Sequence, residues 1–150
     1  MRREDKALTD RAEMEKIIAA ARVCRLALVD NGRPYLVPMC FGYRDQTLYF
    51  HSARKGRKLE ILASNPEVCF EMEVGVEVVP GAVPCKFSMR YRSVIGTGQA
   101  QFVRGDSAKA AALNIIAGQY GAAPYAYSAS ELKRVTIFKV PMTEVTAKKG

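Results

Sequence analysis

Four cations fall within five positions of the stretch "FHSARKGRKLEIL", which covers residues 50–62. The cations surround Gly56, which lies between the end of an apolar strand pattern and the start of a helical one. A helix N-terminus carries unpaired N–H groups and a partial positive charge, so cations placed there oppose the helix dipole. A compensating anion is therefore expected, and a phosphate group fits this chemistry. The four cations are Arg54, Lys55, Arg57 and Lys58.

The residue types of this turn suit a phosphomonoester. Arg57 can hold phosphate oxygens in a bidentate fork, and Lys58 supplies a compact point charge. Ser52 adds a hydroxyl group, and Gly56 lets the backbone approach a ligand closely. A solvated surface turn is the plain alternative, but four cations beside a helix N-terminus weigh against it.

The composition is that of one compact domain. The 150 residues are 49% hydrophobic and 25% charged, which predicts a single domain over residues 1–150 with a substantial core. The formal charge of +8 favours an anionic partner: a nucleic acid, a phosphorylated small molecule or an anionic substrate. No stretch has the length and apolarity of a membrane span, and the polar first residues are unlike a signal peptide. We therefore expect a soluble, cytoplasmic protein.

The four cysteines are widely spaced and form no CxxC pair, and the chain has a single histidine, His51. This pattern predicts neither a metal site nor a disulfide framework. Because several of the cysteines lie in apolar stretches, we expect them to act as small buried hydrophobic residues. The cysteines are Cys24, Cys40, Cys69 and Cys85.

The first half of the chain reads as a helix followed by turn-linked strands. An amphipathic helix is predicted for "TDRAEMEKIIAAARV", with Asp10 as its cap. Two strands, "CRLALV" and "PYLVPMCFGY", flank a tight turn at residues 30–32 and predict a β-hairpin. The stretch "TLYFHS" follows as a third strand, directly before the basic turn.

The second half continues the strand pattern. A strand is predicted for "EVCFEMEVGVEVV", and the run "KFSMRYRSVIGTGQAQFV" is either one long strand or two strands bent at Gly96 and Gly98. The stretch "VTIFKVPMTEV" supplies the last strand.

Helices interrupt the strands at two further places. A short helix starts at Gly56 and stops at the Asn65–Pro66 pair. Asp106 caps an Ala-rich helix that ends at Gly121. About six consecutive strands with short helices at the ends predict a mainly β or α+β fold, built as an antiparallel barrel.

These motifs, in this order, resemble the flavin-binding split-barrel family that includes pyridoxamine 5'-phosphate oxidase. In that family an Arg-Lys pair, a short helix and Asn-Pro follow an aromatic strand, and the pair binds the FMN phosphate. Alignment on Asn65 and Pro66 places the pair on Arg57 and Lys58. The likeness is greatest to the nitroimidazole-resistance subgroup, where counterparts occur of "PYLVPMCFGY", "LYFHSARKGRKLEIL", "NPEVCFE" and "YRSVIGTGQA".

The resemblance implies an antiparallel split β-barrel that binds FMN and forms a homodimer with two FMN sites at the interface. In such a dimer, Arg92 and Ser93 of one subunit approach the flavin held by the other. The resemblance also implies a role for His51, because the matching histidine of the subgroup faces flavin and substrate; from the residue alone, a strand position near the barrel rim is the alternative. The implied cofactor contacts are Val37, Pro38, Met39, Cys40, Phe50, His51, Ser52, Ala53, Gly56, Arg57, Lys58, Arg92 and Ser93.

Three hypotheses follow from residues and resemblance together. The first is an FMN-dependent oxidoreductase that reduces a small oxidised molecule such as a nitroaromatic, with His51 orienting the substrate or donating a proton. The second is a non-enzymatic FMN-binding protein for storage or sensing, and the third is a basic barrel that binds nucleic acid. A deazaflavin or haem in place of FMN stays open, since other split-barrel branches use those ligands. Vitamin B6 oxidation is not expected, because the Trp-containing C-terminal segment of the oxidase has no counterpart in this tryptophan-free chain.

Overall fold

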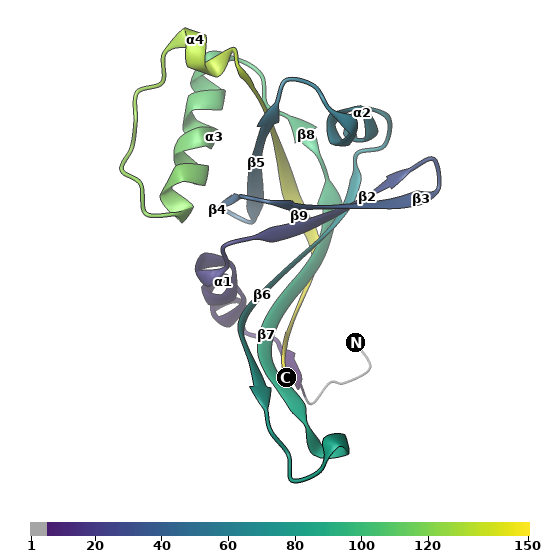
Figure 1. The fold of residues 1–150 in the computed structure, drawn as a ribbon. Coiled ribbons are helices and arrows are strands. Elements are labelled where there is room, and N and C mark those ends of the chain that lie inside the picture. The colour runs from purple at the N-terminus through teal and green to yellow at the C-terminus, as the bar shows by residue number, and fades with distance from the viewer. Residues whose placement is uncertain (1–5) are drawn as a thin grey trace.

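The computed structural model describes residues 6–150 and shows one curved, antiparallel sheet with helices around it (Figure 1). Along the main path the strand order is β3-β2-β6-β7-β9-β5-β4, and β1 and β8 also pair with β9. The strands are β1 (Ala7–Leu8), β2 (Cys24–Asp30), β3 (Arg33–Met39), β4 (Gly42–Arg44), β5 (Thr47–Ala53), β6 (Glu67–Val79), β7 (Ser88–Gln99), β8 (Gln101–Phe102) and β9 (Val135–Lys149). The helices are α1 (Arg11–Ala20), α2 (Arg57–Ser64), α3 (Asp106–Gln119) and α4 (Ala129–Leu132), with a 3-10 turn at Pro84–Lys86.

The two end strands of the path, β3 and β4, adjoin in the sequence at Cys40–Phe41, so the sheet wraps round into an open barrel. This confirms the predicted antiparallel, sheet-rich α+β class. The expected number of about six strands was wrong, because the described residues form nine. Three of them, β1, β4 and β8, have two or three residues each, too short to leave a periodic pattern in the sequence.

The barrel interior is filled by alternate side chains of the long strands. On β5, Leu48, Phe50 and Ser52 are buried, whereas His51 and Ala53 are exposed. This is the two-residue alternation of a strand with one face on a core. β5 therefore presents the histidine outside the barrel.

The helices begin and end close to where the sequence places them. Asp10 caps α1, and its side chain accepts a hydrogen bond from the backbone N–H of Ala12. The cap of α3 is Gly105, with φ 81°, and not Asp106, which is the first helical residue. The sequence analysis missed α4, although Ser128 and Glu131 form a capping box at its start. Helix α3 packs on β4 and β5, and α1 packs on β6 and β7.

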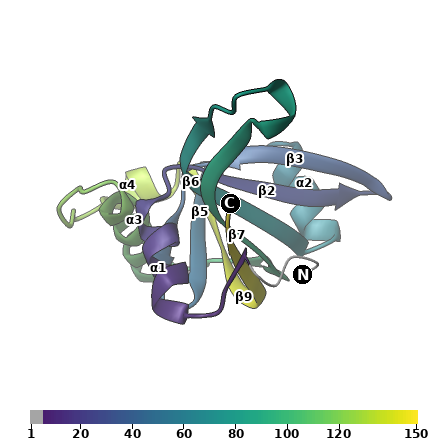
Figure 2. The same cartoon turned by 90° about the horizontal axis from the view of Figure 1, so that it is seen from below.

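Strands β6 and β7 continue past the barrel as a projecting hairpin (Figures 1 and 2). We call residues 75–89 the arm. Its base is marked by a register shift between Val74 and Glu77 and by Gly75, whose φ is 62°. The run that sequence analysis treated as one strand or two is divided at Ala100 into β7 and β8, and the pairing of β7 with β9 shifts register between Gly96 and Gly98.

The described residues contain no helix long and apolar enough to cross a membrane. All four cysteines are free, but only Cys24 is buried. The expectation that the cysteines are buried was wrong for Cys40, Cys69 and Cys85, which are exposed. Cys69 shows the reason: on β6 it lies between buried Val68 and Phe70, and strand alternation turns it to the outer face.

Burial raises the pKa of the Cys24 thiol to about 12, and the nearby Glu71 carboxylate adds to the shift. We expect Cys24→Ser to lower the free energy of unfolding by about 1–3 kcal/mol, because a more polar hydroxyl replaces a thiol in an apolar site. The matched change Cys85→Ser, at an exposed position, is expected to alter it by less than about 0.5 kcal/mol. Urea unfolding followed by circular dichroism measures both.

The raised pKa also predicts a pH dependence. Above pH 9 the thiol of the unfolded chain ionises while that of the folded chain stays protonated, so this contribution to stability is lost as pH rises from about 9 towards 12. Equal pH slopes for the wild type and Cys24→Ser above pH 9 would contradict this assignment.

Candidate functional site

The basic turn joins the end of β5 to α2, as predicted. Gly56 is the N-cap of α2, with φ 145° and ψ 158°, a backbone conformation that is essentially restricted to glycine. Leu59, Ile61 and Leu62 hold the helix on the barrel by burying its apolar face. The helix ends at Asn65, whose N–H donates to the Ile61 carbonyl before Pro66 prevents a further turn.

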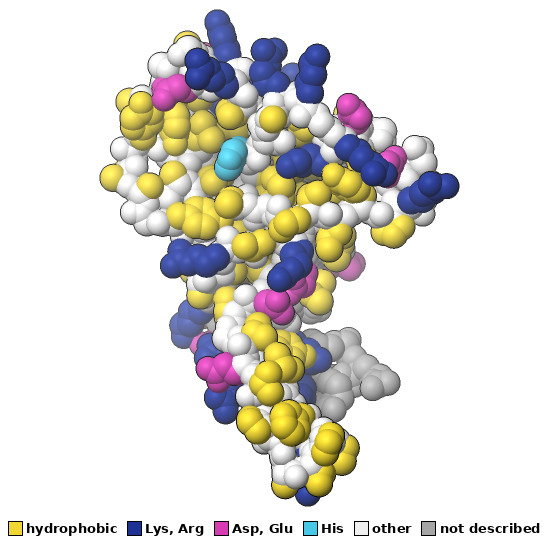
Figure 3. All heavy atoms as spheres, viewed as in Figure 1, with side chains coloured by type: hydrophobic (Ala, Val, Ile, Leu, Met, Phe, Trp, Pro, Cys, Tyr) yellow, Lys and Arg dark blue, Asp and Glu magenta, His cyan; other side chains and the backbone are white. Residues whose placement is uncertain are grey.

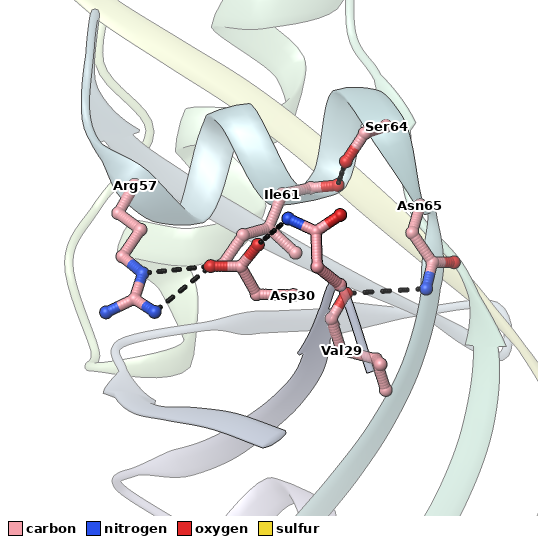
Figure 4. Close-up of polar contacts among 7 residues, drawn as sticks. Val29, Asp30, Arg57, Ile61, Ser64 and Asn65 are labelled. Atoms are coloured by element: carbon pink, nitrogen blue, oxygen red, sulfur yellow. Dashed lines mark hydrogen bonds and ion pairs between the residues drawn. The ribbon is translucent and has the colours of Figure 1, made fainter. Parts of the chain in front are cut away.

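Arg57 is the first residue of α2, and its guanidinium is oriented by residues from the β2–β3 hairpin (Figure 4). Its Nε and Nη2 donate to Oδ2 of Asp30, at 3.2 and 3.0 Å. The guanidinium carbon also lies 4.7 Å from the ring centroid of Tyr35, a cation–π arrangement. The carboxylate of Asp30 thus compensates part of the positive charge of the basic turn. Sequence analysis treated Asp30 only as a turn residue, because the 27 residues that separate it from Arg57 hide the pairing.

The Arg57–Asp30 pair leaves the guanidinium free to bind another anion. The Arg57 side chain is 60% exposed, and an exposed ion pair contributes about 0–1 kcal/mol. A charge-assisted hydrogen bond to a phosphate is worth about 1.5–3 kcal/mol. The carboxylate of Asp30 therefore orients Arg57 and does not compete effectively with a bound phosphate.

Lys58 points to the other end of β3, where its Nζ lies 3.2 Å from Sδ of Met39. Along this segment, Val37 is half-buried and Met39 is buried, whereas the alternate residues Pro38 and Cys40 are exposed. The four residues from 37 to 40 therefore do not present one common surface, because strand alternation divides them between two faces. Lys58 approaches the face that carries Val37 and Met39.

The same division applies to β5. Phe50 is fully buried and stacks on Phe138, so its side chain belongs to the core, and Ser52 is buried beside it. His51 and Ala53 are exposed on the outer face, and Figure 3 shows the histidine, in cyan, on the surface towards the viewer.

Arg92 and Ser93 lie far from this turn within one chain. Arg92 pairs with Lys149 of β9, whereas His51 pairs with Ile137 of the same strand. The two partners on β9 are separated by twelve residues, roughly 40 Å along an extended strand. Within one copy of the chain, Arg92 and Ser93 therefore lie far from His51.

The link between β3 and β4 is anchored from outside the barrel by Tyr120, which follows α3. Its hydroxyl accepts a hydrogen bond from the N–H of Phe41 and donates one to the Arg22 carbonyl, both at 3.0 Å. Burial raises the pKa of Tyr120, so the phenol stays protonated and able to donate. This anchor fixes the backbone at Phe41, directly after Cys40.

The structure also holds two hollows that sequence analysis did not foresee. They have volumes of about 440 and 470 Å³ and share Phe102, Val103 and Arg104. The first is also lined by Arg54 of the basic turn and by Leu59 and Ala63 of α2. The second is lined by α3 and by strands β5, β8 and β9. Neither is lined by His51, Arg57 or Lys58. Within residues 6–150, no group of three His, Cys, Asp or Glu side chains is placed to hold a metal ion.

The pyridoxamine 5'-phosphate oxidase family pattern matches residues 10–149. The chain belongs to this family.

Solved structures extend the comparison. A candidate 5-nitroimidazole antibiotic resistance protein of Bacteroides thetaiotaomicron VPI-5482 is 35% identical, covers 95% of this chain and 86% of its own, and has a TM-score of 0.86. The FAD and heme binding protein of Mycobacterium smegmatis is 22% identical, covers 97% and 73%, and has a TM-score of 0.87. The flavocytochrome Anf3 of Azotobacter vinelandii is 20% identical, covers 100% and 72%, and has a TM-score of 0.85. The last two show that the fold is shared.

A curated relative matches a shorter part of the chain. The uncharacterized protein RA0666 of Rhizobium meliloti strain 1021 is 32% identical over 62 residues, 41% of this chain. The match spans 40% of that protein, less than half its length.

The backbone conformation predicts that substitution by alanine has different effects on stability at Gly56 of the basic turn and at Gly118 of α3. Gly56→Ala is expected to destabilise the protein by about 1–3 kcal/mol, because its φ and ψ disfavour any side chain. Gly118→Ala, in α3 with open space around the new methyl group, is expected to be neutral or to stabilise by up to about 1 kcal/mol. Thermal and urea unfolding compare the two variants, and equal effects would show that the Gly56 conformation is not required.

Proposed function

We propose that the protein is an FMN-dependent oxidoreductase that reduces a small oxidised substrate, with a nitroaromatic compound as the substrate class. The observation that carries this proposal is the basic turn at the start of α2, where Arg57 and Lys58 contact the β2–β3 hairpin. His51 is exposed on β5, the strand that leads into this turn. The 35% identity to a candidate 5-nitroimidazole antibiotic resistance protein supports the same substrate class.

The donors of the turn fit the phosphate of FMN. Arg57 and Lys58 offer two positive charges, and no side chain caps the first N–H groups of α2. Glycine at position 56 places no side chain between a phosphate and these donors. The proposed phosphate ligands are the Arg57 guanidinium, the Lys58 ammonium and the backbone at the start of α2.

The flavin ring is assigned to the surface between β3 and β5. Bound FMN supplies the electron transfer, while the protein contributes position, electrostatics and exclusion of water. On this chain, the exposed Pro38 and Cys40 line the β3 side, and the exposed His51 and Ala53 line the β5 side. Val37 and Met39 lie on the other face of β3, which Lys58 approaches. The buried side chains of Phe50 and Ser52 contribute indirectly, because their packing holds in place the strand that carries His51.

His51 is the proposed catalytic residue. Reduction of a nitro group to a nitroso group takes up two electrons and two protons and releases water. A reduced flavin supplies the electrons, and the exposed imidazole of His51 is placed to hold the substrate or to deliver a proton to its nitro oxygen.

A homodimer is part of the proposal, with FMN at the interface. Arg92 and Ser93 lie too far along the sheet to reach the flavin surface of their own chain. A second copy related by a two-fold axis offers the same residues from outside. We also place the protein in the cytoplasm, where reduced cofactors are available and free thiols such as those of the four cysteines persist.

The proposal names FMN as the cofactor in preference to FAD or heme. Two proteins of the same fold are described as binding FAD and heme or as a flavocytochrome. The Arg57–Lys58 pair at one helix start matches a single terminal phosphate, which favours FMN. Mass spectrometry of the released chromophore distinguishes these cofactors.

Loss of the phosphate ligands is expected to abolish cofactor retention. Arg57→Ala with Lys58→Ala should raise the Kd for FMN by about 100-fold or more, because two charge-assisted hydrogen bonds of about 1.5–3 kcal/mol each are lost. Fluorescence titration of FMN measures the Kd, and absorption spectra show whether the purified protein is yellow.

The matched control for that variant is Arg54→Ala with Lys55→Ala, which removes the same charge from the same exposed turn. It should change the Kd only a few-fold, since only long-range attraction is reduced. Equal losses in the two double variants would mean that the turn acts through net charge alone. Salt-sensitive binding of single-stranded nucleic acid by a colourless wild type would then favour the nucleic-acid hypothesis.

Substitution of His51 should affect turnover and not binding. In His51→Gln, we expect the rate of substrate reduction to fall by roughly 100-fold or more, as for loss of a general acid, with the Kd for FMN unchanged. The FMN-loaded protein is photoreduced without oxygen and mixed with a 5-nitroimidazole, and the return of oxidised-flavin absorbance gives the rate. A wild type that reoxidises no faster than free reduced FMN would instead be a binding protein without this activity.

A further inference from the structure

The hollow of about 440 Å³ gathers three cations from three separate segments of the chain. Arg54 belongs to the basic turn, Arg104 to the loop before α3, and Lys109 to α3 itself. Figure 3 shows Lys and Arg side chains, in dark blue, gathered at the end of the molecule that carries α4 and the end of β5. The volume lies within the range of small-molecule sites. We call this hollow the cation pocket.

The positive charge of the cation pocket is not balanced by ion pairs. Among residues 6–150, no ion pair involves Arg54, Arg104 or Lys109. The pocket contains one carboxylate, Asp106, so three cations and one anion give its walls a net charge of +2. Like charges that share a site repel one another, and a bound anion removes this cost. Other cations of the described surface do have carboxylate partners: Arg11, Lys16, Arg25, Arg57 and Arg90.

The backbone holds the side chain of Lys109 at the wall of the cation pocket. Its Nζ donates to the carbonyls of Leu132 and Val135, both at 3.2 Å. An ammonium group has three donors, so one of them stays available to a ligand. The cations of a solvated surface cluster can move apart in water, whereas this lysine is fixed in the same hollow as two arginines. The fixed ammonium therefore favours a bound anion over a solvated cluster.

Apolar side chains form another part of the wall. Ile137 is fully buried and Leu59 is 8% exposed, and the half-buried Phe102 adds an aromatic ring. A ligand that fills the cation pocket therefore combines an anionic group with a flat, apolar body. A phosphomonoester carries a charge of about −1.5 to −2 at pH 7, which matches the net charge of the walls better than a single carboxylate does. An organic phosphate with a ring fits both parts of the wall.

The cation pocket is separate from the proposed phosphate site of FMN. Arg57 and Lys58 do not line it, and their side chains contact the β2–β3 hairpin instead. The basic turn thus divides its cations between two places, with Arg54 before Gly56 facing the cation pocket. This pocket accounts for a cation of the turn to which the proposed function gives no role.

We propose that the cation pocket is a second ligand site of this protein and binds a small organic phosphate. Arg54, Arg104 and Lys109 hold the phosphate group, and the ring of the ligand packs on Phe102. Gly105 caps α3 without a side-chain hydrogen bond, so the first N–H groups of that helix add a smaller contribution. The site is independent of FMN, because the two share no residue.

Binding is tested with adenosine 5'-monophosphate, which joins a phosphomonoester to a flat ring, and with adenosine, which lacks the phosphate. The nitrogen-15-labelled protein, with the cofactor that it retains, is titrated with each compound and its amide resonances are followed by NMR. We expect saturable shifts around Gly105 and Lys109 with adenosine 5'-monophosphate, and binding of adenosine that is at least about 10-fold weaker. Equal binding of both compounds, no saturable shift, or shifts confined to amides around Arg57 would overturn the proposal.

Substitutions in the pocket wall locate the site. Arg104→Ala, at an exposed position, should raise the Kd of adenosine 5'-monophosphate by at least about 10-fold, because a charge-assisted hydrogen bond is lost. The control Lys133→Ala removes the same charge from an exposed position next to α4 that lines neither hollow, and it should change the Kd by less than about 2-fold.

A third variant should strengthen binding, which a folding defect cannot do. Asp106→Asn removes the one carboxylate of the cation pocket and is expected to lower the Kd a few-fold. Equal effects of Arg104→Ala and Lys133→Ala, or a Kd that does not fall in Asp106→Asn, would show that the anion binds elsewhere. Flavin absorbance should be the same in all three purified variants, and its loss in Arg104→Ala would assign the pocket to the flavin site instead.

Discussion

The stacked rings of Phe50 and Phe138, with centroids 5.1 Å apart, join β5 to β9 at the centre of the barrel. The two residues are directly opposite in the antiparallel register, and both are fully buried. A slip of one residue in this register would bring His51 into the core and push Phe50 into water. The cost of burying an imidazole and exposing a phenyl ring therefore determines which side of β5 faces the candidate site.

The position of the basic turn follows from the same register. β5 ends at Ala53, and the chain leaves the barrel surface at Arg54. It returns with α2, whose apolar face packs on the barrel. Gly56 adopts a conformation that other residues avoid, and this reversal directs the start of α2 towards the β2–β3 hairpin. Asp30 and Tyr35 then orient Arg57 at little cost in stability, which leaves the cation available to a ligand.

Part of the sheet has no packing partner within the chain. β3 has a buried face towards α2 and an exposed apolar face, and β6 and β7 continue into an arm without a core of its own. Arg92 and Ser93 lie at the base of this arm, far from the turn on the same chain. In the proposed homodimer, Arg92 and Ser93 of one chain approach the flavin held by the other.

Local patterns in the sequence determined much of the protein by themselves. Apolar alternation located the long strands, Asp10 and the Asn65–Pro66 pair marked helix ends, and the cations around Gly56 predicted a site for an anion. Each of these signals lies within a few neighbouring residues, where backbone sterics, capping and charge act directly. Structural features that depend on such local interactions can therefore be predicted from the sequence alone.

Only the tertiary structure decided which distant residues meet. It assigned Asp30 and Tyr35 to Arg57, turned Phe50 inward and His51 outward, exposed three cysteines from apolar stretches, and separated Arg92 from the turn. Strand pairing over tens of residues sets these relations, and neither its register nor the face that becomes buried is written in any short stretch. The free energy that favours this register and these faces comes from burying the whole core, and no single segment contributes enough of that core to determine them alone.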